Sequence, residues 1–138
     1  MFNTFTKCCG ILAMFALYFY SAPAAYGQCD ANEVTLSLTF DSYASETSWE
    51  ITDGSGDVIA SAASGSYTGG SVDETICLLD GCSYTLTMSD VYCDGMCCSY
   101  GDGSYSLTDV DGNVLASGGD FGCSESTGFG VGCVATPG

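Results

Sequence analysis

Two stretches of the chain alternate strictly between apolar and polar residues, which is the pattern of a strand with one buried face. They are residues 34–40 and 84–89. The side chains expected to face inward are Val34, Leu36, Leu38, Phe40, Tyr84, Leu86 and Met88. Asp53-Gly54 and Asp111-Gly112 separate further short β-rich runs and predict hairpin turns. Because no helical periodicity follows residue 27, the pattern predicts an all-β fold.

The chain contains an internal repeat. Residues 49–61 align without gaps on residues 105–117. Further correspondences are residues 35–38 with 85–88, Asp41-Ser-Tyr43 with Asp90-Val-Tyr92, and Tyr67…Glu74 with Phe121…Glu125. The repeat predicts two similar halves of four strands, residues 34–79 and 84–134. Together they predict a disulfide-stapled β-sandwich or jelly roll of about eight short antiparallel strands.

The first 27 residues have the layout of a signal peptide. Lys7 precedes an apolar run at residues 11–20, and small residues follow as far as Gly27. An apolar run of this length is too short for a bilayer, which needs about 20 residues. We therefore expect a signal peptide at 1–27, a secreted, extracellular domain at 28–138, and no membrane span.

The distribution of charge limits the possible partners of the protein more than any single motif does. All 17 acidic residues lie beyond residue 27, and the only basic residue of the chain, Lys7, lies before it. A domain without Lys, Arg or His cannot neutralise phosphates, which excludes nucleic acid as a partner. So many like charges repel one another, and bound divalent cations would relieve the repulsion. The alternative is that charge simply keeps the protein soluble.

An even number of cysteines in a short secreted domain predicts disulfides. The expected domain contains Cys29, Cys77, Cys82, Cys93, Cys97, Cys98, Cys123 and Cys133. A metal site built on Cys93, Cys97 and Cys98 is disfavoured, because no histidine is present and the compartment is oxidising. A bond between neighbouring cysteines is strained, so Cys97 and Cys98 are each expected to pair elsewhere. The pairs that we favour are Cys29–Cys133, Cys93–Cys123, and Cys77 and Cys82 with Cys97 and Cys98.

Two segments carry a family resemblance, namely Asp41-Ser-Tyr-Ala-Ser-Glu-Thr-Ser-Trp49 and Asp94-Gly-Met-Cys-Cys-Ser-Tyr-Gly-Asp-Gly-Ser-Tyr105. They resemble the signatures of a poorly characterised extracellular β-sandwich module found in secreted peptidases and adhesion proteins. Residues 118–125 resemble the closing motif of that module. The resemblance implies an extracellular, non-catalytic role and no defined ligand. Cys93 and Cys123 depart from the module's pattern, which favours pairing them with each other.

Catalysis can be assessed by elimination. Without His, Lys or Arg the domain has no Ser–His pair, no Schiff-base lysine and no phosphate clamp. Cysteines held in disulfides supply no thiolate nucleophile. A carboxylate pair remains, but among 17 acids some close pair is unavoidable. We therefore expect that the protein is not an enzyme.

Calcium is the cofactor that the acids favour, because hard cations take several carboxylate oxygens at once and Asp- and Gly-rich loops can surround them. The repeat suggests two equivalent sites. The expected ligands are Asp41, Glu46 and Glu74 in one, and Asp90, Asp94, Asp102 and Glu125 in the other. Asp109-x-Asp111-Gly-Asn113 resembles part of a calcium loop. Its repeat counterpart does not, so a hairpin turn is favoured there. The alternative for all these aspartates is that they begin turns for backbone reasons.

Tyrosines in loops are the candidates for glycan contacts, because a flat aromatic face can stack on a sugar. The candidates are Tyr43, Tyr92 and Tyr100, with Tyr67 as a further loop tyrosine. Trp49 and Tyr105 alternate with apolar neighbours and are expected in the core. The alternative for each loop tyrosine is that it covers an end of the core.

Two functions remain open. The favoured one is a structural protein that self-assembles into an extracellular filament, coat or matrix and is stabilised by calcium. In that case residues 128–132 or the N-terminal segment of the domain would complete a neighbour's sheet. The alternative is a monomeric module for cell adhesion or polysaccharide binding.

Overall fold

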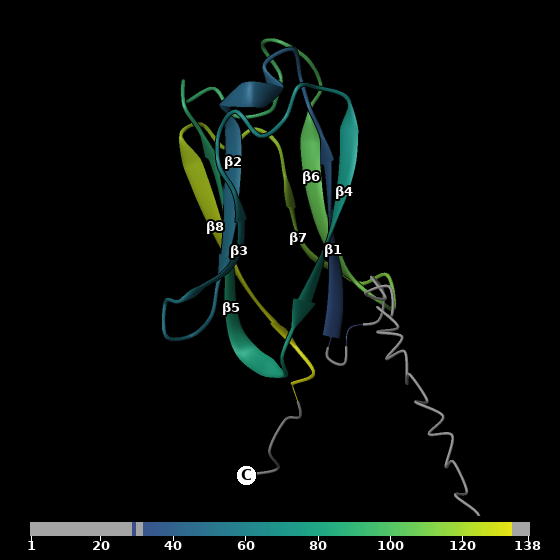
Figure 1. Ribbon diagram of the computed structural model, residues 1–138. Helices are drawn as coiled ribbons and strands as arrows, with labels where there is room; N and C mark the ends of the chain where they lie inside the picture. Colours follow the sequence, from purple (N-terminus) through teal and green to yellow (C-terminus); the bar gives the residue numbers. More distant parts are fainter. Residues whose placement is uncertain (1–28, 30–31, 134–138) are drawn as a thin grey trace, which may run out of the picture.

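The computed structural model describes Cys29 and residues 32–133, and the expected signal peptide lies outside them (Figure 1). The described chain is all-β, with a single 3-10 turn, η1 (Ala44–Glu46). The strands are β1 (Asn32–Thr39), β2 (Thr47–Thr52), β3 (Val58–Ala62), β4 (Ser71–Leu78), β5 (Gly81–Asp90), β6 (Ser104–Asp109), β7 (Val114–Gly118) and β8 (Ser124–Val131). In this part of the chain no helix is long and apolar enough to cross a membrane.

The strands form two four-stranded antiparallel sheets, in the orders β4-β1-β6-β7 and β3-β2-β5-β8. The sheets face each other as a β-sandwich (Figure 1). The two orders are related by the repeat. If each strand of the first sheet is replaced by its counterpart in the other half, β4-β1-β6-β7 becomes β8-β5-β2-β3, which is the second sheet read backwards. The sequence repeat therefore reappears as an approximate two-fold relation, in which each half contributes two strands to each sheet. The predicted all-β sandwich is confirmed.

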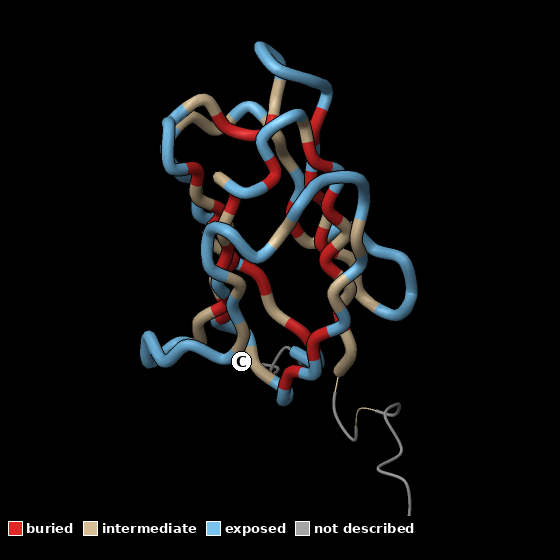
Figure 2. The backbone as a smooth tube through the Cα atoms, turned by 45° about the horizontal axis from the view of Figure 1, so that its top comes forward, coloured by how far each residue is buried: buried red, intermediate tan, exposed pale blue. Residues whose placement is uncertain are grey.

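The apolar alternation places the core between the sheets. Buried residues alternate with less buried ones along the central strands (Figure 2). All seven side chains predicted to face inward are buried, and so are Trp49 and Tyr105. Val34, Leu36, Ile51 and Leu107 have no exposed surface at all. The period of two in the sequence therefore predicted the core correctly.

The two ends of the sandwich differ in their connections. At the end drawn uppermost in Figure 1 the strands are joined by residues 40–46, 63–70, 91–103 and 119–123, and we call this the loop end. At the opposite end, which we call the hairpin end, the connections are residues 53–57, 79–80 and 110–113. The first and last of these join antiparallel neighbours, which confirms both predicted hairpin turns.

The disulfides correct most of the expected pairing. The pairs are Cys29–Cys77, Cys82–Cys133, Cys93–Cys123 and Cys97–Cys98. Only Cys93–Cys123 was predicted, and the neighbours Cys97 and Cys98 are bonded to each other. The reason for the two pairs at the hairpin end is strand register. Glu33 of β1 lies opposite Cys77 of β4, which brings Cys29 within reach of Cys77.

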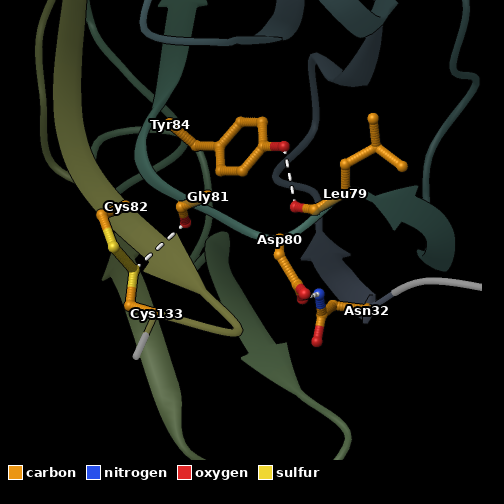
Figure 3. The surroundings of a disulfide bond; sticks show 7 residues. All are labelled: Asn32, Leu79, Asp80, Gly81, Cys82, Tyr84 and Cys133. Carbon is orange, nitrogen blue, oxygen red and sulfur yellow. Dashed lines mark hydrogen bonds between the residues drawn. A yellow bond between two sulfur atoms is a disulfide. The ribbon is translucent and has the colours of Figure 1, made fainter. Parts of the chain in front are cut away.

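The Cys82–Cys133 disulfide closes the hairpin end beside the β4–β5 turn (Figure 3). Gly81 lies opposite Val131, so Cys82 and Cys133 meet where β5 begins and β8 ends. Beside them the Tyr84 hydroxyl donates to the Leu79 carbonyl oxygen at 2.9 Å. The Asn32 amide donates to Asp80 Oδ1 at 2.6 Å. These contacts hold the turn against the start of β1.

The glycine-rich segment that was expected to complete a neighbour's sheet is used within the chain. Most of residues 128–132 belong to β8, which pairs with β5. Phe129 and Val131 are buried in the core. This segment is therefore not free to be donated, and the expectation was wrong. The N-terminal segment that was the other candidate lies largely outside the described residues.

Candidate functional site

Each half ends its first strand with the same Asp-x-Tyr turn. The Asp41 carboxylate accepts the backbone N–H of Tyr43 at 2.8 Å. The Asp90 carboxylate accepts the N–H of Tyr92 at 2.9 Å and that of Asp94 at 3.4 Å. An aspartate that binds backbone N–H groups ahead of it fixes the direction of the turn. Both turns lie at the loop end and present exposed tyrosines there.

Backbone hydrogen bonds tie each turn to a loop of the other half. Ser42 N–H donates to the Tyr100 carbonyl at 3.2 Å, and Val91 N–H donates to the Glu46 carbonyl at 3.2 Å. The Ser42 hydroxyl adds a second bond to the Tyr100 carbonyl at 2.7 Å. The loop end is therefore one structure built from both halves.

The long loop between β5 and β6 is held in place by a buried side chain, a backbone hydrogen bond and a disulfide. Met96 is completely buried, and its N–H donates to the Gly119 carbonyl at 2.8 Å. Gly95 has a φ of +70°, and a Cβ there would lie 2.7 Å from that same carbonyl oxygen, so only glycine fits. The Cys93–Cys123 disulfide joins the loop to residues 119–123. A loop held at these points can present side chains in a fixed arrangement.

The side chains presented there line one open depression of about 330 Å³, and they are Tyr43, Glu46, Tyr92, Asp94 and Tyr100. All three tyrosines are exposed. The rings of Tyr43 and Tyr100 meet edge to face with their centroids 5.1 Å apart. The three tyrosines singled out from the sequence therefore lie together, with two carboxylates among them.

Three of the acids at the loop end are crowded. Carboxylate oxygens of Glu46, Asp90 and Asp94 lie within 4.8 Å of one another. Partial burial raises the pKa of Glu46, and the charges of Asp90, Asp94 and Asp41 raise it further. Burial also raises the pKa of Asp90, against the effect of the two backbone N–H groups that it accepts. Three carboxylate oxygens this close could hold a metal ion.

The structure groups the other predicted ligands differently from the expected sets. Glu74 accepts the Tyr67 hydroxyl at 2.9 Å, and Tyr67 in turn accepts the Trp49 indole N–H at 2.8 Å. Glu125 accepts the Tyr105 hydroxyl at 2.6 Å. Each glutamate thus binds a tyrosine hydroxyl, but Glu74 lies opposite Leu36 of β1 and Glu125 opposite Met88 of β5, so the two are offset by two residues in the repeat. Neither belongs to the group formed by Glu46, Asp90 and Asp94.

Asp41 and Asp102 also stand apart from that group. Asp41 binds the turn that it begins, although its charge is felt at Glu46. Asp102 forms an isolated β-bridge with Cys97, and its carboxylate lies close to the sulfurs of the Cys97–Cys98 pair. The crowded group therefore combines one residue from the first expected site with two from the second. The feature that links them is the register of Thr47 opposite Asp90.

The segment that resembles a calcium loop is a hairpin turn. Asp109 Oδ1 accepts the N–H groups of Asp111 and Asn113, and its Oδ2 accepts the Asn113 side-chain amide. These donors, the side-chain amide above all, lower the pKa of Asp109. Asp53 accepts the N–H groups of Ser55 and Asp57 in the equivalent turn. Both carboxylates have backbone partners and lie at the hairpin end.

No family model, no curated protein and no solved structure matches the chain. The fold and the site therefore define a class only, a disulfide-stapled all-β sandwich with a tyrosine-lined depression at one end. The resemblance to an extracellular β-sandwich module stays a prediction.

Sequence reasoning missed the residues that position the depression. Met96 anchors its long loop, and Ser42 joins the two halves. One signal for Met96 was available: it is the one large apolar residue in a run of Asp, Gly and Cys. In such a run a methionine is favoured where it can be buried against the core. No comparable signal marks Ser42, because its role depends on contacts with the other half.

Proposed function

We propose that this protein is a secreted, non-catalytic binding module that holds a neutral glycan at the loop end with the help of calcium. The observation that carries the proposal is the shared depression of Tyr43, Tyr92 and Tyr100 with Glu46 and Asp94. Exposed aromatic faces stack on the apolar faces of sugar rings, while carboxylates accept sugar hydroxyls. A neutral ligand is favoured because a chain with a net charge of −16 repels anions.

Calcium has a definite role in this proposal. The cation would bind Glu46, Asp90 and Asp94 and relieve the repulsion among them. Calcium takes six to eight oxygen ligands, so three carboxylates leave positions for the hydroxyls of a bound sugar. The scaffold supports such a site, because disulfides and a buried methionine hold the loops in place before the ligand arrives.

The absence of His, Lys and Arg beyond residue 27 supports a non-catalytic role. The paired cysteines support an oxidising, extracellular environment. Self-assembly, the favoured expectation from the sequence, loses its first mechanism because residues 128–132 mostly fill the chain's own β8.

The test is glycan-array binding by the oxidised domain in millimolar calcium and in chelator. We expect binding of neutral polysaccharides that falls at least tenfold with chelator and in the triple variant Tyr43→Ala/Tyr92→Ala/Tyr100→Ala. Leu79→Ala is the control, because Leu79 is an exposed apolar residue at the hairpin end. Binding no stronger than that of the triple variant would refute the proposal. Glycan binding unaffected by chelator would refute the role of calcium alone.

A further inference from the structure

Four strands lie at the edges of the two sheets, and they differ in charge. β4 and β8 carry acids, namely Asp73, Glu74 and Glu125. β3 (Val-Ile-Ala-Ser-Ala) and β7 (Val-Leu-Ala-Ser-Gly) carry none. Natural sheets protect an edge by keeping it short or bulged, or with charged side chains, prolines or a cover, because unpaired N–H and C=O groups can pair with another strand. β3 and β7 are short and each has a register irregularity at its start, but neither contains a charge or a proline.

The same two strands expose apolar side chains. Val58, Ile59 and Val114 are the large apolar side chains that are exposed on strands of the described chain, and all three lie on β3 or β7. The two strands occupy equivalent places in the repeat and end different sheets. The molecule therefore presents two nearly identical, uncharged edges.

We propose that β3 and β7 are contact edges at which a second copy of this chain adds a strand to the sheet. Charge favours a second copy as the occupant. In a chain of net charge −16, these edges are where two copies can approach without placing carboxylates opposite each other. Sequence favours it as well, because an edge that pairs with its like needs a partner carrying the same short apolar strand, and each copy carries two.

Charge also selects the direction of pairing. Asp57 directly precedes β3, and Asp111 closely precedes β7. Parallel pairing would bring these acids side by side, whereas antiparallel pairing separates them by the length of the strand, roughly 17 Å for five residues. Antiparallel pairs are also slightly more stable per residue. The register irregularity at the start of each strand leaves Ala60–Ala62 and Ala116–Gly118 as the regular part of each edge.

Two interchangeable edges on one molecule have a definite consequence for assembly. A copy with both edges free can bind two neighbours and extend a chain of copies. A copy with one edge blocked can form only a dimer, and a copy with both blocked stays monomeric. Because the remaining surface is acidic, salt that screens repulsion should promote the association. None of these steps involves the tyrosine-lined depression, so the inference goes beyond the proposed function and does not depend on it.

The test is sedimentation velocity of the oxidised domain over a range of concentrations in about 0.5 M NaCl, where screening is nearly complete. The variants are Val58→Asp, Val114→Asp and the double variant. The control is Val110→Asp, which adds the same charge at a residue 72% exposed in a hairpin tip, against 55% for Val58 and 62% for Val114. Circular dichroism of each variant verifies that it is folded.

We expect the unmodified protein and Val110→Asp to form species that grow beyond a dimer with concentration. Each single-edge variant should stop at a dimer, and the double variant should remain a monomer. A monomer at every concentration for the unmodified protein would overturn the inference. Growth of the double variant equal to that of the control would also overturn it. If the unmodified protein assembles but binds no glycan, only the proposed function is refuted.

Discussion

At the hairpin end, Asp53 and Asp109 each begin a turn and accept backbone N–H groups from residues just ahead. At the loop end, Asp41 and Asp90 do the same, but Asp90 also lies beside Glu46 and Asp94. The pKa of Asp109 is accordingly lowered, whereas the pKa values of Asp90 and Glu46 are raised. The same residue type in the same kind of turn is stabilised at one end and strained electrostatically at the other. The comparison identifies the loop end as the place where burial and neighbouring carboxylates disfavour negative charge.

The largest expected difference between the ends concerns their disulfides. Cys82 and Cys133 are 51 residues apart, so the Cys82→Ala/Cys133→Ala variant should lose about 4 kcal/mol of unfolding free energy by the chain-entropy relation. Cys97 and Cys98 are 1 residue apart, so their disulfide closes no comparable loop, and the variant Cys97→Ala/Cys98→Ala removes little constraint from the unfolded chain. Its loss should stay below about 1 kcal/mol. Urea unfolding of both variants measures the difference, and equal losses would contradict the pairing.

A smaller effect should follow the removal of the Asp109 carboxylate. Because the pKa of Asp109 is lowered in the folded protein, its charged form stabilises the fold above its ordinary pKa of 3.8, and this contribution is lost as pH falls. Asp109→Ala should therefore melt a few degrees lower than the parent at pH 7, with the difference closing near pH 2. Asp111→Ala is the control, because its carboxylate accepts no hydrogen bond among the described residues. Equal shifts in both variants would show that the turn bonds do not matter.

The smallest effect has the opposite sign. The pKa of Glu46 is raised in the folded protein, so its charged form opposes folding once the pH exceeds its ordinary value of 4.5. Without calcium, Glu46→Gln should melt slightly higher than the parent at pH 7 and equally below pH 4.5. Calcium should raise the melting temperature of the parent more than that of this variant. Glu50→Gln, on the outer face of β2, should leave the calcium response unchanged. A calcium response retained in Glu46→Gln would exclude this carboxylate as a ligand.

The core and the hairpins could be predicted from the sequence because both depend on neighbours along the chain. An alternation such as Val34–Phe40 fixes which side chains share a face, and Asp-Gly pairs fix where the chain reverses. The repeat also indicated that Glu74 and Glu125 are equivalent. In the structure each accepts a tyrosine hydroxyl, but the two lie at different positions of the repeat, opposite Leu36 and Met88, so this equivalence was wrong.

The two disulfides at the hairpin end and the acidic group could not be predicted, because both depend on strands that are distant in sequence. Cys29 meets Cys77, and Glu46 meets Asp90, only because of the register of β1 with β4 and of β2 with β5. The repeat encouraged the assumption that each half forms its own site. The halves are in fact interleaved, so residues of different halves become neighbours.

This interleaving means that neither half is a complete unit. The central pairs β1–β6 and β2–β5 each join one half to the other, so a peptide containing only β1–β4 would leave β1 and β2 each without one of its two neighbours. In the intact chain β6 and β5 fill those positions, and their sequences repeat the patterns of β2 and β1. This is the arrangement that duplication and fusion of a small homodimer would produce. A chain cut between β4 and β5 should accordingly behave as two fragments that recover the sandwich when mixed.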